Sequence, residues 1–374
     1  MDSIIKQFMQ VWKINGGSIA ITKNGNFVYT NAFGYADKRK SEPTQTKHLF
    51  RIASVSKSIT SIAIMKMMEE GRLKLTDTVF GSNRILDNSY YLSSVSDKRI
   101  LNITVNDLLE HTSGWDRAVP VDGFTHSDPA FFPLHVCEVL KAPNPVGDST
   151  LIKFALLKGL NDAPGKHYAY SNIGYLILGK VIEKLSGMNY ETYLMKTIFN
   201  PLGITDISLG NNLSSDKKEN EVEYSGEALS FSCYGGGALV ESQYGGFNVE
   251  AMNAHGGWIA SAESLAKLLL AVDGFSTSPD LLSPATINSM NNPGSLQPGY
   301  AKGWFVNRLN NRWHTGSMDG TSSFVCITGD GYTWTFLFNS RSDNSPAFWK
   351  AFDRLPRQCI NALPKSNSYV HAAD

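Results

Sequence analysis

Strand-forming segments lie at both ends of this 374-residue chain, and a mostly helical stretch separates them. Near the start, residues 17–22 and 27–32 flank the turn Lys23-Asn24-Gly25-Asn26, a pattern typical of a β-hairpin. Near the end of the chain, four more strands are predicted at residues 302–308, 313–315, 322–328 and 332–339. A helix over 346–360 is predicted to follow them. The simplest fold is α+β: one antiparallel sheet formed from both chain termini and flanked by helices, with a mostly helical inserted subdomain.

The middle of the chain supplies the predicted helices. Helical patterns run over 106–110 and 175–185, and a further helix is expected over 265–272. Two long segments between these elements are rich in residues that favour turns. We therefore predict a long ordered loop over 115–150 and a second loop, or a lid, over 210–250.

At 374 residues the chain can hold one large domain or two linked ones, and we expect a single domain over 1–374. We expect an α/β part at about 1–75 and 255–374, and a helical part at about 76–254. The net charge is zero and no basic stripe is present, which argues against nucleic acid as a partner. No apolar run approaches the roughly 20 residues that a membrane-spanning helix needs.

The cysteine and histidine patterns predict neither a disulfide framework nor a metal site. Four cysteines are widely scattered without Cys-x-x-Cys, and the histidines lack spacings such as His-Glu-x-x-His. We therefore expect no metal and no cofactor. Residues 1–9 lack the pattern of a signal peptide, which predicts a cytoplasmic protein, or a secreted or periplasmic one if a leader has been removed.

A serine followed three residues later by a lysine marks the candidate nucleophile. This spacing occurs five times, beginning at Ser3, Ser54, Ser214, Ser215 and Ser264. Only the copy at Ser54 continues as a nearly all-apolar helix, which is predicted to end at Gly71. If that helix begins near Ala53, Ser54 and Lys57 lie on one face, about 5–6 Å apart at Cβ.

This arrangement favours nucleophilic catalysis. A helix that is apolar on most sides is buried, and burial lowers the pKa of a lysine. A neutral Lys57 could remove the proton of Ser54, which would then attack a carbonyl carbon. The start of a helix also favours the negative charge that develops there.

Two further motifs accompany this serine and lysine. Tyr168-Ala169-Tyr170-Ser171-Asn172 contains Tyr-x-Asn directly before an apolar helix, and His314-Thr315-Gly316-Ser317 follows a predicted strand. A second Tyr-x-Asn, at Tyr29-Thr30-Asn31, lies inside the predicted hairpin.

Together the three motifs resemble those of the serine β-lactamase and penicillin-binding-protein superfamily. The chain is most similar to the class C β-lactamase-like branch, with its family VIII carboxylesterases and DD-peptidases. Further segments resemble recurrent family segments in the family's order: residues 71–77, 108–115, 200–203 and 256–261.

The resemblance implies a serine hydrolase that acts through an acyl-enzyme on a small ester, amide or peptide: a carboxylesterase, a peptidase or a weak β-lactamase. It implies that Ser54 is the nucleophile and that Lys57 and Tyr170 share the proton transfers, with Tyr170 activating the deacylating water. Asn172 would hydrogen-bond Lys57 and the substrate.

The resemblance also assigns the third motif to substrate and oxyanion binding, through His314, Thr315, Gly316 and Ser317. The backbone N–H groups of Ser54 and Ser317 would form the oxyanion hole. β-Lactamases carry lysine at the position of His314, and histidine there resembles family VIII esterases and some DD-peptidases.

Other interpretations remain open at this point. An acyltransferase would use the same serine and pass the acyl group to an alcohol or amine, whereas an inactive binding module would keep only the fold. The absence of Gly-x-Ser-x-Gly argues against an α/β-hydrolase. His111 is interpreted as a buried, hydrogen-bonded structural residue, and Ser56 and Ser58 as small packing residues.

Overall fold

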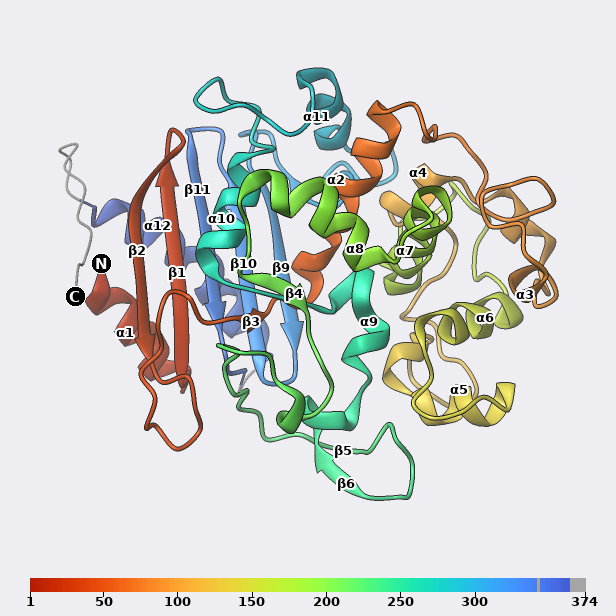
Figure 1. Ribbon diagram of the computed structural model, residues 1–374, viewed down its shortest axis with the longest axis horizontal. Coiled ribbons are helices and arrows are strands. Elements are labelled where there is room, and N and C mark those ends of the chain that lie inside the picture. The colour runs from red at the N-terminus through yellow and green to blue at the C-terminus, as the bar shows by residue number, and fades with distance from the viewer. Residues whose placement is uncertain (342–343, 364–374) are drawn as a thin grey trace.

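The computed structural model describes residues 1–341 and 344–363, and its largest sheet combines strands from both ends of the chain (Figure 1). Six strands follow the order β2-β1-β11-β10-β9-β8, each antiparallel to its neighbours. They are β1 (Gly16–Lys23), β2 (Asn26–Gly34), β8 (Phe305–Val306), β9 (Arg312–Met318), β10 (Thr321–Ile327) and β11 (Tyr332–Phe338). Because β1 pairs with β11, the predicted α+β architecture is confirmed.

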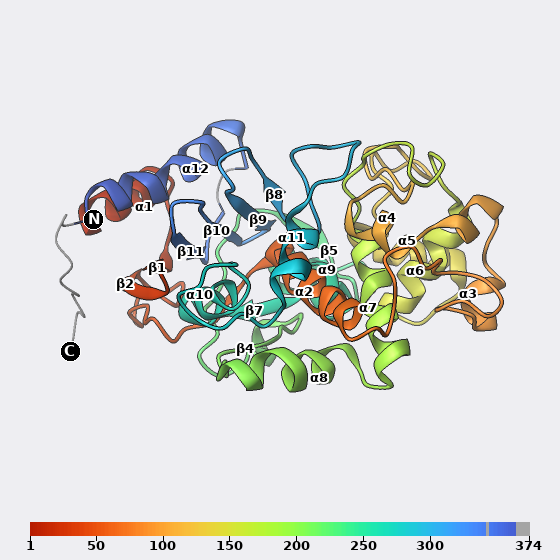
Figure 2. The same ribbon diagram turned by 90° about the horizontal axis from the view of Figure 1, so that it is seen from above.

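Helices cover both faces of this sheet (Figure 2). α1 (Asp2–Val11) and α12 (Pro346–Asn361) lie together on one face, and α10 (Ala262–Leu270) packs on β1 and β11. Side chains alternate along β11 accordingly. Phe336 and Phe338 join the apolar cluster that contains residues of α1 and α12, whereas Leu337 joins the larger core on the opposite face.

The helical part of the molecule is built around α7 (Asn172–Ser186), which is buried along most of its length. Ser171 caps its start by accepting a hydrogen bond from the Gly174 N–H, and Gly187 ends it with a φ of 70°. α7 contacts α2 (Ser56–Glu69), α4 (Val105–Leu109), α6 (Asp148–Lys158), α8 (Tyr190–Leu194) and α9 (Val249–Gly256). The remaining α-helices of the described chain are α3 (Ser89–Leu92), α5 (Pro133–Leu140) and α11 (Pro284–Asn291).

The two predicted long loops contain regular structure, so that part of the prediction was wrong. Segment 115–150 holds α5 and the beginning of α6, and segment 210–250 holds the hairpin of β5 (Leu229–Phe231) and β6 (Leu239–Glu241). A small sheet, in the order β3-β7-β4, was also not predicted; its strands are β3 (Phe50–Arg51), β7 (Trp258–Ala260) and β4 (Ile207–Leu209). Strands of two or three residues are too short to show the period-two pattern on which such predictions depend.

Candidate active site

Ser54 lies in a single 3-10 turn, Ala53–Val55, that joins β3 to α2. The α-helix begins at Ser56, three residues after the predicted start near Ala53, so Ser54 lies in the turn before it. Ala53 has a φ of 46°, a left-handed conformation that is unfavourable for residues other than glycine. The turn is anchored to the main sheet, because Ser323 Oγ donates to the carbonyl oxygen of Ile52 over 2.8 Å.

Lys57, in the first turn of α2, is fully buried, and its amine lies beside the serine. Nζ is 3.1 Å from Ser54 Oγ and 2.8 Å from the carbonyl oxygen of His255. Burial lowers the pKa of Lys57 well below its ordinary value; Asp128 opposes this shift and Arg117 adds to it. A neutral amine at this position can accept the hydroxyl proton of Ser54.

Tyr170 precedes α7 and places its ring next to Lys57. Nζ of Lys57 lies 4.9 Å from the ring centroid, and the guanidinium carbon of Arg117 lies 4.8 Å from it. Burial raises the pKa of Tyr170, while its interaction with the Ser54 hydroxyl and the charge of Arg117 oppose that rise. Tyr170 is therefore a protonated phenol, which can donate a proton.

His111 holds the ring of Tyr170 in place. The two ring centroids are 4.3 Å apart. His111 Nδ1 accepts the backbone N–H of Ser171 over 3.1 Å, so Nε2 carries the proton, and it lies 3.1 Å from the Tyr300 hydroxyl. Burial, followed by the nearby Lys57, lowers the pKa of His111 well below its ordinary value. The prediction of a buried, hydrogen-bonded histidine is confirmed.

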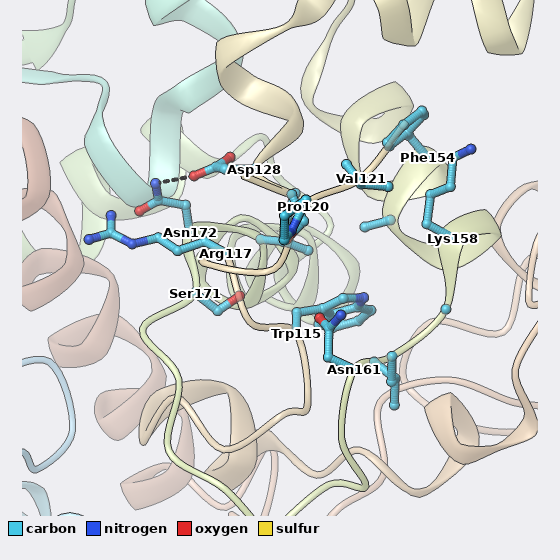
Figure 3. A pocket seen from close by; sticks show the side chains of 15 residues that line it. Trp115, Arg117, Pro120, Val121, Asp128, Phe154, Lys158, Asn161, Ser171 and Asn172 are labelled. Carbon is cyan, nitrogen blue, oxygen red and sulfur yellow. Dashed lines mark hydrogen bonds between the residues drawn. The ribbon is translucent and has the colours of Figure 1, made fainter. Parts of the chain in front are cut away.

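Asn172, the first residue of α7, directs its side-chain amide towards Asp128, as Figure 3 shows. Asn172 Nδ2 donates to Asp128 Oδ2 over 2.5 Å, and both side chains are buried. Asn172 Oδ1 is buried without a hydrogen-bond partner in the described part of the chain. The hydrogen bond between Asn172 and Lys57 that the sequence predicts is not formed among these residues. Asn172 Oδ1, the atom that could accept a hydrogen bond from Lys57, has no donor there.

The residues of the third motif all lie on β9, which passes close to the turn that carries Ser54. Gly316 permits this approach: a Cβ there would lie 2.1 Å from the carbonyl oxygen of Ile52 and 2.2 Å from Ser323 Oγ. β8 pairs only with residues 312 and 313 of β9. Within the described ranges, the rest of this strand edge has no strand partner.

His314 is neutral at physiological pH. Burial, followed by the charge of Lys57, lowers its pKa to about 3. Its Nδ1 lies 2.7 Å from the carbonyl oxygen of Thr315, an arrangement in which Nδ1 carries the proton and Nε2 is an acceptor. That Nε2 atom is buried without a partner in the portion of the chain described.

A cavity of about 780 Å³ borders the nucleophile. Its lining includes five of the predicted site residues: Ser54, Tyr170, His314, Thr315 and Ser317. Arg117 and Arg341 line it as well, and Arg341 donates to Ser317 Oγ and pairs with Asp319. Asn172 lines instead a smaller cavity of about 80 Å³ that it shares with Asp128, and Arg117 borders both cavities (Figure 3).

Across residues 1–341 and 344–363, no group of three or more His, Cys, Asp and Glu side chains could hold a metal ion. In the same ranges, no helix is long and apolar enough to cross a bilayer. All four cysteines are free thiols.

The sequence matches a protein-family model described as Beta-lactamase over residues 1–354. The chain belongs to the Beta-lactamase family. This family is part of the serine β-lactamase and penicillin-binding-protein superfamily, and the chain is class C-like, as its three motifs predicted.

Relatives of this Beta-lactamase family member include Protein flp from Staphylococcus aureus (strain MRSA252), which is 28% identical over 370 residues. The match covers 96% of this chain and 66% of Protein flp, so the chain spans just under two thirds of that relative. An octameric penicillin-binding protein homologue from Pyrococcus abyssi has a TM-score of 0.69 at 26% identity, covering 96% of this chain and 76% of the other. A D-amino acid amidase from Ochrobactrum anthropi SV3 has a TM-score of 0.71 at 21% identity, covering 96% and 98%, and shares the fold.

Sequence reasoning missed two charged residues at this Beta-lactamase family site. Asp128 and Arg117 both come from the segment predicted as a loop, and both act on the charge state of Lys57. A buried aspartate among turn-forming residues looks in sequence like any other loop aspartate. Only its hydrogen bond with Asn172 in the folded structure identifies it.

Proposed function

We propose that this protein is a serine hydrolase that acts through an acyl-enzyme on Ser54, with a small ester or amide as its substrate. The observation that supports this most directly is the 3.1 Å separation between Ser54 Oγ and a buried Lys57 Nζ whose pKa is strongly lowered. The cavity beside Ser54 gives a substrate access to the serine and to Tyr170. Amidases and penicillin-binding proteins share the fold, which agrees with this reaction class.

In the proposed acylation, Lys57 takes the proton of Ser54 while Oγ attacks the carbonyl carbon of the substrate. The tetrahedral intermediate then expels an alcohol or amine, which takes its proton from Tyr170. Ser54 now carries the acyl group as an ester, Lys57 is an ammonium and Tyr170 is a phenolate. These opposite charges lie close together, since Nζ is 4.9 Å from the ring centroid.

Deacylation returns both protons. The Tyr170 phenolate removes a proton from water, and the resulting hydroxide attacks the ester carbonyl. When the second tetrahedral intermediate collapses, Ser54 Oγ leaves and recovers its proton from Lys57. The acid product is released and each residue regains its starting state, so no net proton remains on the protein.

Intact-mass spectrometry after mixing the protein with p-nitrophenyl acetate tests this proposal. An acetyl adduct on Ser54 that forms and then decays in water is the expected result. An adduct that persists until an alcohol or amine is added would show an acyltransferase instead. A folded protein that forms no adduct and releases no nitrophenol would reject the proposal in favour of a binding module.

His314 is predicted to favour neutral substrates. Because its pKa is about 3, the imidazole is uncharged at pH 7.5 and gives no ionic contact to a substrate carboxylate. One charge-assisted hydrogen bond contributes about 1.5–3 kcal/mol. We therefore expect neutral short-chain esters to exceed β-lactams in kcat/KM at pH 7.5, and His314→Lys to narrow the gap by improving the anionic substrate.

A pair of esters that differ only by a carboxylate provides the measurement, and His314→Gln is the matched control. Glutamine keeps hydrogen-bonding capacity without a charge, so its preference should stay close to that of the wild type. A wild type that prefers the carboxylate, with no change in His314→Lys, would show that Arg117 or Arg341 in the same cavity sets the charge preference instead.

A further inference from the structure

Asp128 is buried next to the proposed site, and two donors hold its carboxylate. Oδ2 accepts the Nδ2–H of Asn172 over 2.5 Å, and Oδ1 accepts the backbone N–H of Ala130 over 3.2 Å. The second contact caps the short turn Pro129–Phe131. With only 4% of Asp128 exposed, solvent cannot substitute for these donors.

The contact with Asp128 decides which way the Asn172 amide faces. A flipped amide would place its oxygen against the carboxylate oxygen, where neither atom has a proton to donate. Asn172 is thereby held with Nδ2 on Asp128 and with Oδ1 directed elsewhere. That oxygen is buried and lacks a partner within the described residues, so it can receive a new N–H donor.

Lys57 becomes such a donor during the reaction. A neutral amine has two N–H groups, whereas the ammonium formed after proton transfer from Ser54 has three. Ser54 Oγ and the His255 carbonyl oxygen already lie within hydrogen-bond distance of Nζ. Asn172 Oδ1 would supply a third acceptor.

Asp128 also acts on Lys57 through its charge. The titratable and charged groups that act electrostatically on Lys57, or lie against it, are Asp128, Arg117, His111, His255, His314, Tyr170 and Tyr175. The pKa values of the three histidines are lowered and those of the two tyrosines are raised, so all five are neutral near pH 7. Asp128 thus supplies the negative charge that favours the lysine ammonium, against burial and Arg117.

We propose that Asp128 is a positioning residue for the reaction: it orients the Asn172 amide so that Oδ1 can accept from Lys57, and it keeps a negative charge beside that lysine. This inference rests on the acyl-enzyme function proposed above. Orientation and charge are separable effects. Asp128→Asn keeps an acceptor for Asn172 Nδ2 but removes the charge, whereas Asp128→Ala removes both.

The pH profile of kcat/KM for p-nitrophenyl acetate distinguishes the two effects. Removing the negative charge lowers the pKa of Lys57 further, so the acid limb in Asp128→Asn should move to lower pH by on the order of one unit. Its maximum should stay within about tenfold of the wild type. In Asp128→Ala the amide is no longer oriented, and we expect a loss of about tenfold to a hundredfold at every pH.

Asp122→Asn is the matched control, because Asp122 lies in the same segment and its carboxylate binds Lys158 and His135 instead of Asn172. Its acid limb should coincide with that of the wild type. The inference is overturned if the limb of Asp128→Asn does not move, or if Asp122→Asn moves it equally; should Asp128→Ala not fold, Asp128→Asn alone decides. A wild type without a Ser54 adduct would reject the proposed function itself, which separates the two failures.

Discussion

Ser54→Ala should abolish turnover and adduct formation while the protein keeps its fold. Removal of the nucleophile ends covalent catalysis, and we expect the rate to fall to less than roughly one thousandth of the wild-type value. The fold should survive, because the Ser54 side chain does not cap the 3-10 turn or α2. Nitrophenol release and intact mass measure the first effect, and thermal unfolding measures the second.

Ser58→Ala is the control for this prediction. Ser58 lies in the first turn of α2, and its hydroxyl donates to the carbonyl oxygen of Gly303 over 2.8 Å. Loss of that bond should lower stability slightly and leave Ser54 acylation intact. Substantial turnover by a folded Ser54→Ala protein would show that another residue is the nucleophile.

Lys57→Arg should be nearly inactive, because a guanidinium stays protonated and cannot accept the proton of Ser54. General-base catalysis typically contributes about 10²–10⁴ in rate, and we expect a loss of that size. In the wild type, activity should rise with pH, since the pKa of Lys57 is lowered and the neutral amine is the active form. Steady-state rates from mildly acidic to mildly alkaline pH provide the measurement. A Lys57→Arg protein with a near-normal rate would show that another group is the base.

Lys57→Met separates the loss of the base from the loss of the fold. A lysine whose folded-state pKa lies below its unfolded-state pKa binds fewer protons when folded. The free energy of unfolding therefore increases as the pH rises from the folded-state pKa to the unfolded-state pKa. Methionine has no such dependence. The variant should therefore be inactive yet more stable than the wild type near pH 7, and the difference should shrink towards pH 10.

The pairing of Ser54 with Lys57 could be predicted from local sequence, because the two residues are neighbours along the chain. Ser54 and Lys57 are three residues apart where a short turn leads into a helix, and their Oγ and Nζ atoms lie 3.1 Å apart. The apolar residues that follow predict the burial that lowers the lysine pKa. The β1–β2 hairpin was equally predictable, since Asn24 and Gly25 both have the positive φ that its turn needs.

What the sequence could not indicate depends on contacts between distant segments. Asp128 meets Asn172 only because the segment after Trp115 brings it to the start of α7, and no periodic pattern encodes that path. The left-handed φ of Ala53 was equally invisible, because nothing about an alanine marks such a conformation. It is the neighbouring β10, through Ser323, that holds the turn in place.

The pairing of β1 with β11 has a consequence for how the protein is made. The Gly16 N–H bonds to Asn339 Oδ1 across 323 residues of sequence, so the central sheet cannot close until nearly all of the described chain has left the ribosome. Until then the hairpin keeps an unpaired edge, and the Ser54 turn lacks the support of β9 and β10. Contacts this distant along the chain make folding slow and leave edges exposed to aggregation. Newly synthesised molecules should therefore acquire their reactive serine late, and a chaperone that covers the open edge of β1 should raise the yield of active protein.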